Sequence, residues 1–338
     1  MHTKLFLLLA SVIFISSCEE ALIGPAVPND PISNFEEMWQ SYDQYYGLFG
    51  VKEVDWQATY HQYRPLINEQ TTDNDLKTIF HEMIDPLDDN HTYIITTENE
   101  PRIESGIFDT LKVQTDFSLD LIPSYVSDFT HYGAAIDYGT LDGNIGYIHL
   151  GDFIPSRNYF EDALDQIIGK LKDTDGLVID IRDNPGGNDV AAQYVAGRFA
   201  AERKLYMTVR KKSGPGPNDF TQAIPWHVEP TGGTRYTKPV VLLTSRWTQS
   251  AGETFTLAMQ ELTGVTQLGD YTSGAFSDNI ARELPNGWFC FMSIGDYRAA
   301  DGKSYEGIGV KPDILMVNSK SDILSGRDLA LEKALELL

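Results

Sequence analysis

Four short apolar runs that alternate with amphipathic helical segments constrain the fold of this chain more than any other feature. The runs lie in GNIGYIHLGDF, DGLVIDIRDNPGG, KPVVLLTS and VTQLGD, between residues 143 and 270. Between them come NYFEDALDQIIGKLKD, NDVAAQYVAGRFA and SAGETFTLAMQEL, which carry apolar residues at helical spacing. Strands that are apolar throughout are buried on both faces, and strands that alternate with helices pair in parallel. The pattern therefore predicts an α/β fold with a largely parallel sheet covered by helices.

The residues before this pattern are expected to form a smaller region of their own. FEEMWQSYDQYYGLF and LKTIFHEMIDPL place apolar and aromatic residues three and four positions apart, which is typical of helices. Residues 32–95 are therefore predicted as an N-terminal helical region. Residues 96–338 are predicted as the α/β core, which ends with a helix in RDLALEKALELL.

The first residues are typical of a secretory signal. MHTK carries positive charge, LFLLLASVIFI is too short to span a bilayer, and small residues precede Cys18. The ISSC ending resembles the lipobox of bacterial lipoproteins, which implies a signal peptide over residues 1–17 and a lipid on Cys18. The alternative is a plain signal peptide with an incidental cysteine.

Lipidation of Cys18 would place the chain in the bacterial cell envelope. Residues 18–31 would then be a tether that holds the protein just off a membrane, on the periplasmic side or at the cell surface. Cys290 would be left without a second cysteine, so no internal disulfide is expected.

Charge and motif content exclude several partners. The 26 basic and 49 acidic side chains give a net charge of −23, and such a surface repels phosphate backbones, so we expect no nucleic acid partner. The sequence has neither an H-E-x-x-H motif nor clustered cysteines. We therefore expect no metal and no cofactor.

Two stretches suit acyl-transfer chemistry but also have plainer interpretations. Ser250 in WTQSAGETF stands at the start of a helical segment, where N–H groups and the helix dipole favour an oxyanion. Ser250 and Glu253 also form the S-x-x-E pattern of a capping box. In DIRDNPGG, Gly186 and Gly187 suit either oxyanion donors or a turn with positive φ angles. Neither stretch alone decides between the two interpretations.

Five motifs together carry a resemblance to a known family. The chain contains, in this order, GYIHLGDF, DGLVIDIRDNPGG, PVVLLTSRWTQSAGE, LGDYTSGAF and YEGIGVKPDI. The order resembles that of the tail-specific, or C-terminal processing, serine proteases, which include the core protease module of tricorn. The resemblance implies a core related to the crotonase and Clp protease architecture. It also implies that Ser250 is the nucleophile and that the N–H groups of Ala251 and of Gly186 or Gly187 form the oxyanion hole.

One residue departs from the pattern of the bacterial processing proteases and changes the expected mechanism. Those enzymes pair the serine with a lysine, whereas Ala275 occupies the matching position in TSGAF. A methyl group accepts no proton, so Ser250 needs another base. The tricorn-like branch uses a histidine after its helical region, and His91 in LDDNHTYI resembles that motif. A glutamate orients the histidine in that branch, and Glu306 in SYEGIGVKPD matches it.

These two residues also have plainer interpretations. His91 fits a histidine in a polar turn, and Glu306 fits a solvated turn carboxylate in an acidic protein. Asn90 stands where tricorn has a serine linked to the glutamate, so that link would differ here. The other histidines are expected in the signal (His2), on helix surfaces (His61, His81), in loops (His131, His227) and in a strand (His149).

The resemblance implies a serine endopeptidase that cleaves polypeptides through an acyl-enzyme. Ser250 would be the nucleophile and His91 the general base, with Glu306 orienting His91. About fifty residues separate His91 from Gly143, too few for the peptide-binding PDZ domain of many processing proteases, so no PDZ domain is expected. Two other classes stay open: a non-catalytic ligand- or peptide-binding protein on the same fold, and an acyl hydrolase that acts on a non-peptide ester.

Overall fold

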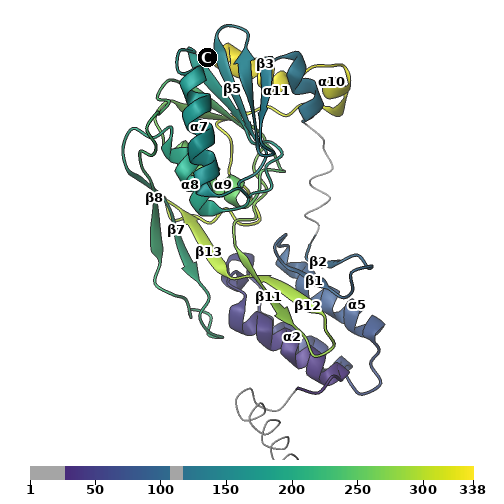
Figure 1. The fold of residues 1–338 in the computed structure, drawn as a ribbon. Helices are drawn as coiled ribbons and strands as arrows, with labels where there is room; N and C mark the ends of the chain where they lie inside the picture. Colours follow the sequence, from purple (N-terminus) through teal and green to yellow (C-terminus); the bar gives the residue numbers. More distant parts are fainter. Residues whose placement is uncertain (1–26, 107–116) are drawn as a thin grey trace, which may run out of the picture.

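The computed structural model describes residues 27–106 and 117–338 (Figure 1). The predicted signal peptide, residues 1–17, lies outside these residues, as do Cys18 and the first part of the predicted tether. Within the two described stretches, no helix has both the length and the apolar composition that a bilayer span requires.

A seven-stranded mixed sheet forms the centre of the larger part of the chain. Its strand order is β14-β10-β9-β6-β5-β4-β3. The five strands from β14 to β5 pair in parallel, and β4 and β3 extend one edge as antiparallel strands. The predicted α/β fold with a largely parallel sheet is confirmed, since the four apolar runs form β5, β6, β9 and β10. The bounds are β3 Ser127–Tyr132, β4 Ile136–Leu141, β5 Ile145–Leu150, β6 Gly176–Asp180, β9 Val240–Thr244, β10 Val265–Gly269 and β14 Ile314–Leu315.

Helices cover both faces of this sheet because successive side chains of each strand point to opposite faces. Ile148 and Ile179 pack in the cluster under α7, α8 and α9. Tyr147 and Val178 pack in the cluster on the other face, under η3 and α11. Figure 1 shows the two helical layers on either side of the strands. The helix bounds are η3 Leu119–Ser124, α7 Arg157–Leu171, α8 Asp189–Gly197, α9 Ala251–Gln260, α10 Lys320–Leu324 and α11 Leu329–Leu337.

The N-terminal helices pack against a second, antiparallel sheet of order β11-β12-β1-β2. Strand β1 follows the helices, whereas β11 and β12 come from near the C-terminus, and Tyr93 of β1 pairs with Phe291 of β12. The predicted boundary between residues 95 and 96 therefore separates the helices from the core but divides this sheet. The bounds are α2 Pro31–Tyr45, α3 Phe49–Lys52, α4 Trp56–Tyr63, η1 Arg64–Leu66, α5 Asp73–Ile84, η2 Asp85–Leu87, β1 Tyr93–Ile95, β2 Ile103–Glu104, β11 Asn279–Glu283 and β12 Phe289–Ser293.

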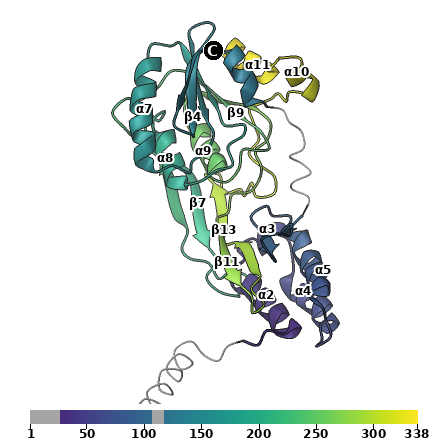
Figure 2. The same ribbon diagram turned by 45° about the vertical axis from the view of Figure 1, so that its right-hand side comes forward.

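A third sheet, of order β13-β7-β8, runs from the core toward the N-terminal helices (Figure 2). Its strands are β7 Lys204–Lys211, β8 Ile224–Val228 and β13 Gly295–Ala299. His227 lies in β8 and His131 in β3, so the prediction that both histidines lie in loops is wrong. Both strands are edge strands. Strand β3 is mostly exposed and lacks the apolar run that marks a buried strand, whereas β8 is short and contains Pro225, which is not typical of a strand interior.

Candidate active site

Ser250 occupies a sharp turn between β9 and α9. Its φ of 55° and ψ of −120° are rare for a residue with a side chain, and such strain costs about 1–3 kcal/mol. The Glu253 carboxylate accepts the Ser250 N–H at 3.3 Å, which is one half of the capping box, but the Ser250 hydroxyl itself makes no capping bond. An ordinary N-cap, however, has extended backbone, as Ser156 has before α7 with φ −65° and ψ 158°. The strain at Ser250 exceeds what capping requires and is typical of a nucleophile elbow.

The carboxylate of Glu253 ties the Ser250 turn to the loop after β10. Its two oxygens accept from the N–H groups of Ser250 (3.3 Å), Gly274 (2.7 Å) and Ala275 (2.7 Å) and from the hydroxyl of Thr272 (2.6 Å). Burial raises the pKa of Glu253 to about 7, although these donors favour the ionised form. The Ser250 N–H also donates to the Ala275 carbonyl at 3.0 Å. The segment that carries the family lysine elsewhere thus packs directly on the Ser250 turn.

The glycines of DIRDNPGG lie against the same turn. Gly186 and Gly187 have φ angles of 103° and 135°. A Cβ on Gly186 would lie 2.6 Å from the Ser250 Cβ and 2.9 Å from the Ala251 nitrogen, so this close approach requires glycine. The Gly186 N–H donates to the Asn184 Oδ1 at 2.8 Å. Among the described residues, the N–H groups of Gly187 and Ala251 have no such acceptor, which makes them the two candidate oxyanion donors.

His91 follows the N-terminal helices in the chain and reaches the Ser250 turn in space. The Asp89 carboxylate accepts the His91 N–H at 2.9 Å, and the Asn279 amide donates to the His91 carbonyl at 3.1 Å. The Nε2 of His91 lies 3.4 Å from the Nε2 of Gln249, the residue before Ser250, although the two are 158 positions apart. With the amide as donor, the imidazole Nε2 is the acceptor. This is the tautomer that a general base needs.

Glu306 is buried, with 6% of its surface exposed, so its interpretation as a solvated turn carboxylate is wrong. Its Oε2 accepts the Phe276 N–H at 3.0 Å, one residue beyond Ala275. Burial and then the charge of Asp89 raise the pKa of Glu306 well above its usual range, and Lys52 opposes them. Asp89 also holds the His91 backbone. Glu306 is thus tied to the loop that packs on the Ser250 turn, and the Asp89 that holds the His91 backbone also acts on its carboxyl group.

The other buried histidine, His149, has a different role. Its Nδ1 lies 2.9 Å from the Asp137 carboxylate and its Nε2 lies 2.7 Å from that of Asp183. Burial lowers the pKa of His149, but the hydrogen bonds to these carboxylates outweigh burial and raise the pKa to about 10. His149 is therefore a cation near neutral pH and no base. Across residues 27–106 and 117–338, no group of three or more His, Cys, Asp and Glu side chains is placed to bind a metal ion.

Sequence reasoning missed several residues that hold the site in place. Asn184 fixes the Gly186 N–H. The Arg182 guanidinium, 1% exposed, bonds the carboxylates of Asp180 at 2.6 Å and Asp328 at 2.7 Å, which ties the end of β6 to the start of α11. A signal was available in DIR, since two charged residues interrupt an apolar run and buried charges are paired. No such signal marks the distant Asp328.

The fold and the strained serine turn together define a tail-specific protease architecture. The family model for peptidase family S41 matches residues 144–316, and the model for the tricorn protease C1 domain matches residues 28–85. This chain belongs to peptidase family S41. The resemblance derived from the five motifs is thereby confirmed.

Individual relatives agree with this assignment. The chain is 28% identical over 174 residues to the carboxy-terminal processing protease CtpA of Bacillus subtilis, covering 51% of this chain and 35% of that protein. It is 26% identical over 211 residues to the carboxyl-terminal-processing protease of Synechocystis, covering 61% and 46%. The chain thus spans less than half the length of these curated relatives. A crystal structure of a candidate peptidase from Parabacteroides merdae is 31% identical with a TM-score of 0.82, covering 92% of this chain and 97% of that one.

Proposed function

We propose that this chain is a serine peptidase that cleaves polypeptides through an acyl-enzyme. Ser250 attacks a peptide carbonyl, and His91 accepts its proton and returns it to the leaving amine. Glu306 orients His91, and the N–H groups of Ala251 and Gly187 hold the oxyanion. Water then attacks the acyl-enzyme by the same proton route. A general base typically contributes about 10²–10⁴ in rate, and one oxyanion donor about 10²–10³.

The observation that carries the proposal is the strained backbone of Ser250. Helix capping needs no φ of 55°, and strained backbone of this kind is concentrated at functional sites. The 3.4 Å approach of the His91 Nε2 to Gln249, the residue before Ser250, supports His91 as the base. Both features argue for catalysis over a non-catalytic binding role.

Ala275 favours the histidine mechanism over a damaged lysine mechanism. Its N–H donates to the Glu253 carboxylate, its carbonyl accepts the Ser250 N–H, and its side chain is fully buried. An intact alternative base in His91 makes the missing lysine dispensable. An acyl hydrolase acting on a non-peptide ester would use the same groups, so substrate assays must distinguish it.

Two measurements test the proposal. A fluorophosphonate probe should label the native chain at Ser250 and should leave Ser250→Ala unlabelled, because only an activated serine reacts. With an unstructured peptide, Ser250→Ala and His91→Ala should each lose nearly all turnover, and the double variant should be little worse, because these residues act as a unit. Glu306→Gln should be milder. Full peptidase activity in a folded His91→Ala variant would contradict the assigned base, and ester turnover without peptide turnover would support the acyl hydrolase.

We also propose that the mature chain begins at a lipidated Cys18 and works at a membrane of the bacterial cell envelope. The lipobox-like ISSC ending and the apolar run before it support this location. A single acyl chain binds membranes only marginally, so stable anchoring needs more than one chain.

A further inference from the structure

His149 connects the antiparallel edge of the large sheet to the loop that carries one of the two candidate oxyanion donors. It lies in β5 and pairs with Asp137 of the neighbouring strand β4. Its Nδ1 lies 2.9 Å from the Asp137 carboxylate, and its Nε2 lies 2.7 Å from the carboxylate of Asp183. Asp183 is the first residue of the oxyanion loop, residues 183–187, which ends at Gly187. The imidazole ring therefore lies between two carboxylates, one of which belongs to this loop.

Backbone groups at the end of β5 and just after it hold other parts of the oxyanion loop. The Asn184 amide donates to the Leu150 carbonyl at 2.8 Å, and the Phe153 N–H donates to the Gly186 carbonyl at 2.7 Å. Of these contacts with the loop, the one made by the imidazole is the only one between two charged groups. Hydrogen bonds between charged groups are roughly twice as strong as neutral ones. The imidazole contact is therefore a main constraint on the start of the loop.

Charged groups surround His149 on both sides. Besides the two bonded carboxylates, Asp180 of the adjacent strand β6 favours the imidazolium, and Asp180 is itself paired with Arg182 at 2.6 Å. At the outer end, the exposed His131 of β3 bonds the other oxygen of Asp137. His149 is the buried cation among these groups, with 3% of its surface exposed.

We propose that His149 is a positioning residue for the oxyanion hole. Its imidazolium holds the Asp183 carboxylate, and the oxyanion loop with it, so that the Gly187 N–H is directed at the reacting carbonyl oxygen. The imidazolium also compensates the negative charge that Asp183 places in this loop, where a second negative charge forms during the reaction. The inference rests on the proposed function, because it needs an oxyanion to form beside Ser250.

These two contributions predict a particular pattern of losses. Removal of the cation alone leaves the Asp183 carboxylate unpaired in the oxyanion loop, so this change should be the most harmful. Removal of the carboxylate alone loosens the loop but also takes away the repelling charge, and His149 stays paired with Asp137. Removal of both groups restores the charge balance. The double change should therefore be no worse than loss of the cation alone.

The test measures how fast a fluorophosphonate probe labels Ser250, because the phosphonyl oxygen occupies the oxyanion hole and no polypeptide is needed. His149→Gln should slow labelling about tenfold to a hundredfold, because the oxyanion donor is misplaced rather than removed. Asp183→Asn should slow labelling less, and the double variant should be no slower than His149→Gln. With a peptide substrate, kcat should fall in the same order while KM changes little, because the oxyanion forms only during the reaction.

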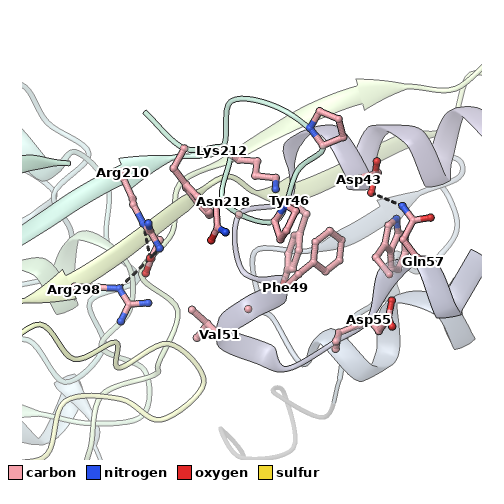
Figure 3. Close-up of a pocket in the computed structure, with 18 residues that line it drawn as sticks. Asp43, Tyr46, Phe49, Val51, Asp55, Gln57, Arg210, Lys212, Asn218 and Arg298 are labelled. Carbon is pink, nitrogen blue, oxygen red and sulfur yellow. Dashed lines mark hydrogen bonds and ion pairs between the residues drawn. The ribbon is translucent and has the colours of Figure 1, made fainter. Parts of the chain in front are cut away.

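Asp43→Asn is the matched control for Asp183→Asn. Asp43 is another partly exposed carboxylate with a side-chain partner, since it accepts from the Gln57 amide at 3.2 Å. Figure 3 shows this pair in the cavity between the N-terminal helices and β7, which Ser250 does not line. Asp43→Asn should leave the labelling rate unchanged. His131→Gln, at the exposed end of the network, should leave it unchanged as well.

Nitrogen NMR of the imidazole rings checks the charge of His149 independently of Ser250. Its pKa of about 10 predicts that the ring is still a cation at about pH 8, where an ordinary histidine is neutral. The signal is assigned by its absence from His149→Gln. A neutral ring at about pH 8 would overturn the proposal.

The labelling rates give the other decisive outcomes. A folded His149→Gln variant that is labelled as fast as the parent would overturn the proposal, as would losses that multiply in the double variant. If His149→Gln does not fold, equal rates for Asp183→Asn and Asp43→Asn have the same meaning. A parent that is labelled but cleaves no polypeptide would contradict the proposed peptidase activity and leave this proposal standing. An unlabelled parent would contradict both.

Discussion

Replacing Ser250 with glycine should stabilise the fold while it removes turnover. The φ of 55° and ψ of −120° cost a residue with a side chain about 1–3 kcal/mol, and glycine escapes this cost. Glycine also gives the unfolded chain more freedom, which destabilises the fold by about 0.5–1 kcal/mol. The two effects leave a net gain of about 1 kcal/mol for glycine over alanine at this position.

Ser250→Ala is the matched control for this prediction. Alanine keeps the Cβ and therefore the strain, but it removes the nucleophilic hydroxyl as glycine does. The backbone has little freedom to relax in either variant, because the residue 250 N–H donates to the Ala275 carbonyl at 3.0 Å and to the Glu253 carboxylate at 3.3 Å. Both variants should lose turnover, and only Ser250→Gly should gain stability.

Urea unfolding followed by circular dichroism measures the difference. The variants should share one m-value, so that a shift in midpoint reports stability rather than a change in the surface exposed on unfolding. Equal stability, or a less stable Ser250→Gly, would show that the turn is unstrained. The strained backbone of Ser250 would then no longer support the proposed peptidase activity.

Three further predictions follow from the residues around Ser250 and from the N-terminus. Glu253→Gln should lower both the stability and kcat/KM at neutral pH. The glutamine amide nitrogen accepts no hydrogen bond, and each buried donor that is left without an acceptor costs about 1–3 kcal/mol. The pKa of Glu253 is raised from 4.5 to about 7 in the folded protein. The carboxyl group therefore contributes its full stabilisation below pH 4.5 and loses it as the pH rises through about 7. The urea midpoint of the parent should fall across this pH range, and that of Glu253→Gln should not show this fall. Ala275→Lys should not raise peptidase activity and should crowd the turn; a gain in kcat/KM would instead identify a disabled lysine-type enzyme. Cys18→Ala should move the chain from the membrane fraction to the soluble fraction, and mass spectrometry of the parent should find a lipidated N-terminal cysteine; a soluble parent with another N-terminus would contradict the lipobox interpretation.

The parallel core could be predicted because its sequence signal is local. Val178 and Ile179 face opposite sides of the sheet and both are fully buried, so β6 carries a continuous apolar run before Asp180 and contrasts with the helices on either side of it. The two smaller sheets carry no such signal. The pairing of Tyr93 with Phe291 joins segments that are far apart in the chain. No local pattern in either segment indicates which other segment it pairs with.

In the candidate site, too, some features could be predicted from the local sequence and others could not. Ser250 could be located from its motif, but the motif is also a capping box, and only the backbone angle separates the two interpretations. The choice between Gly186 and Gly187 depended on the Asn184 side chain, which occupies the Gly186 N–H at 2.8 Å. The burial of Glu306 could not be read from its neighbours in SYEGIGVKPD, which are typical of an exposed turn. Local motifs therefore identified the candidate residues, while contacts between distant segments determined how those residues are arranged.

The buried charges beside His91 bear on how the proposed mechanism works. Burial and the charge of Asp89 both disfavour an ionised Glu306, and Lys52 opposes them. In the proposed mechanism His91 becomes positively charged when it accepts the Ser250 proton, and a positive charge close to Glu306 would favour the ionised form of that carboxyl. The attraction is therefore strongest when the imidazolium forms, which is the condition for lowering a barrier rather than only tightening the ground state. Asp89 would act through position as well as charge, since it also bonds the His91 backbone at 2.9 Å.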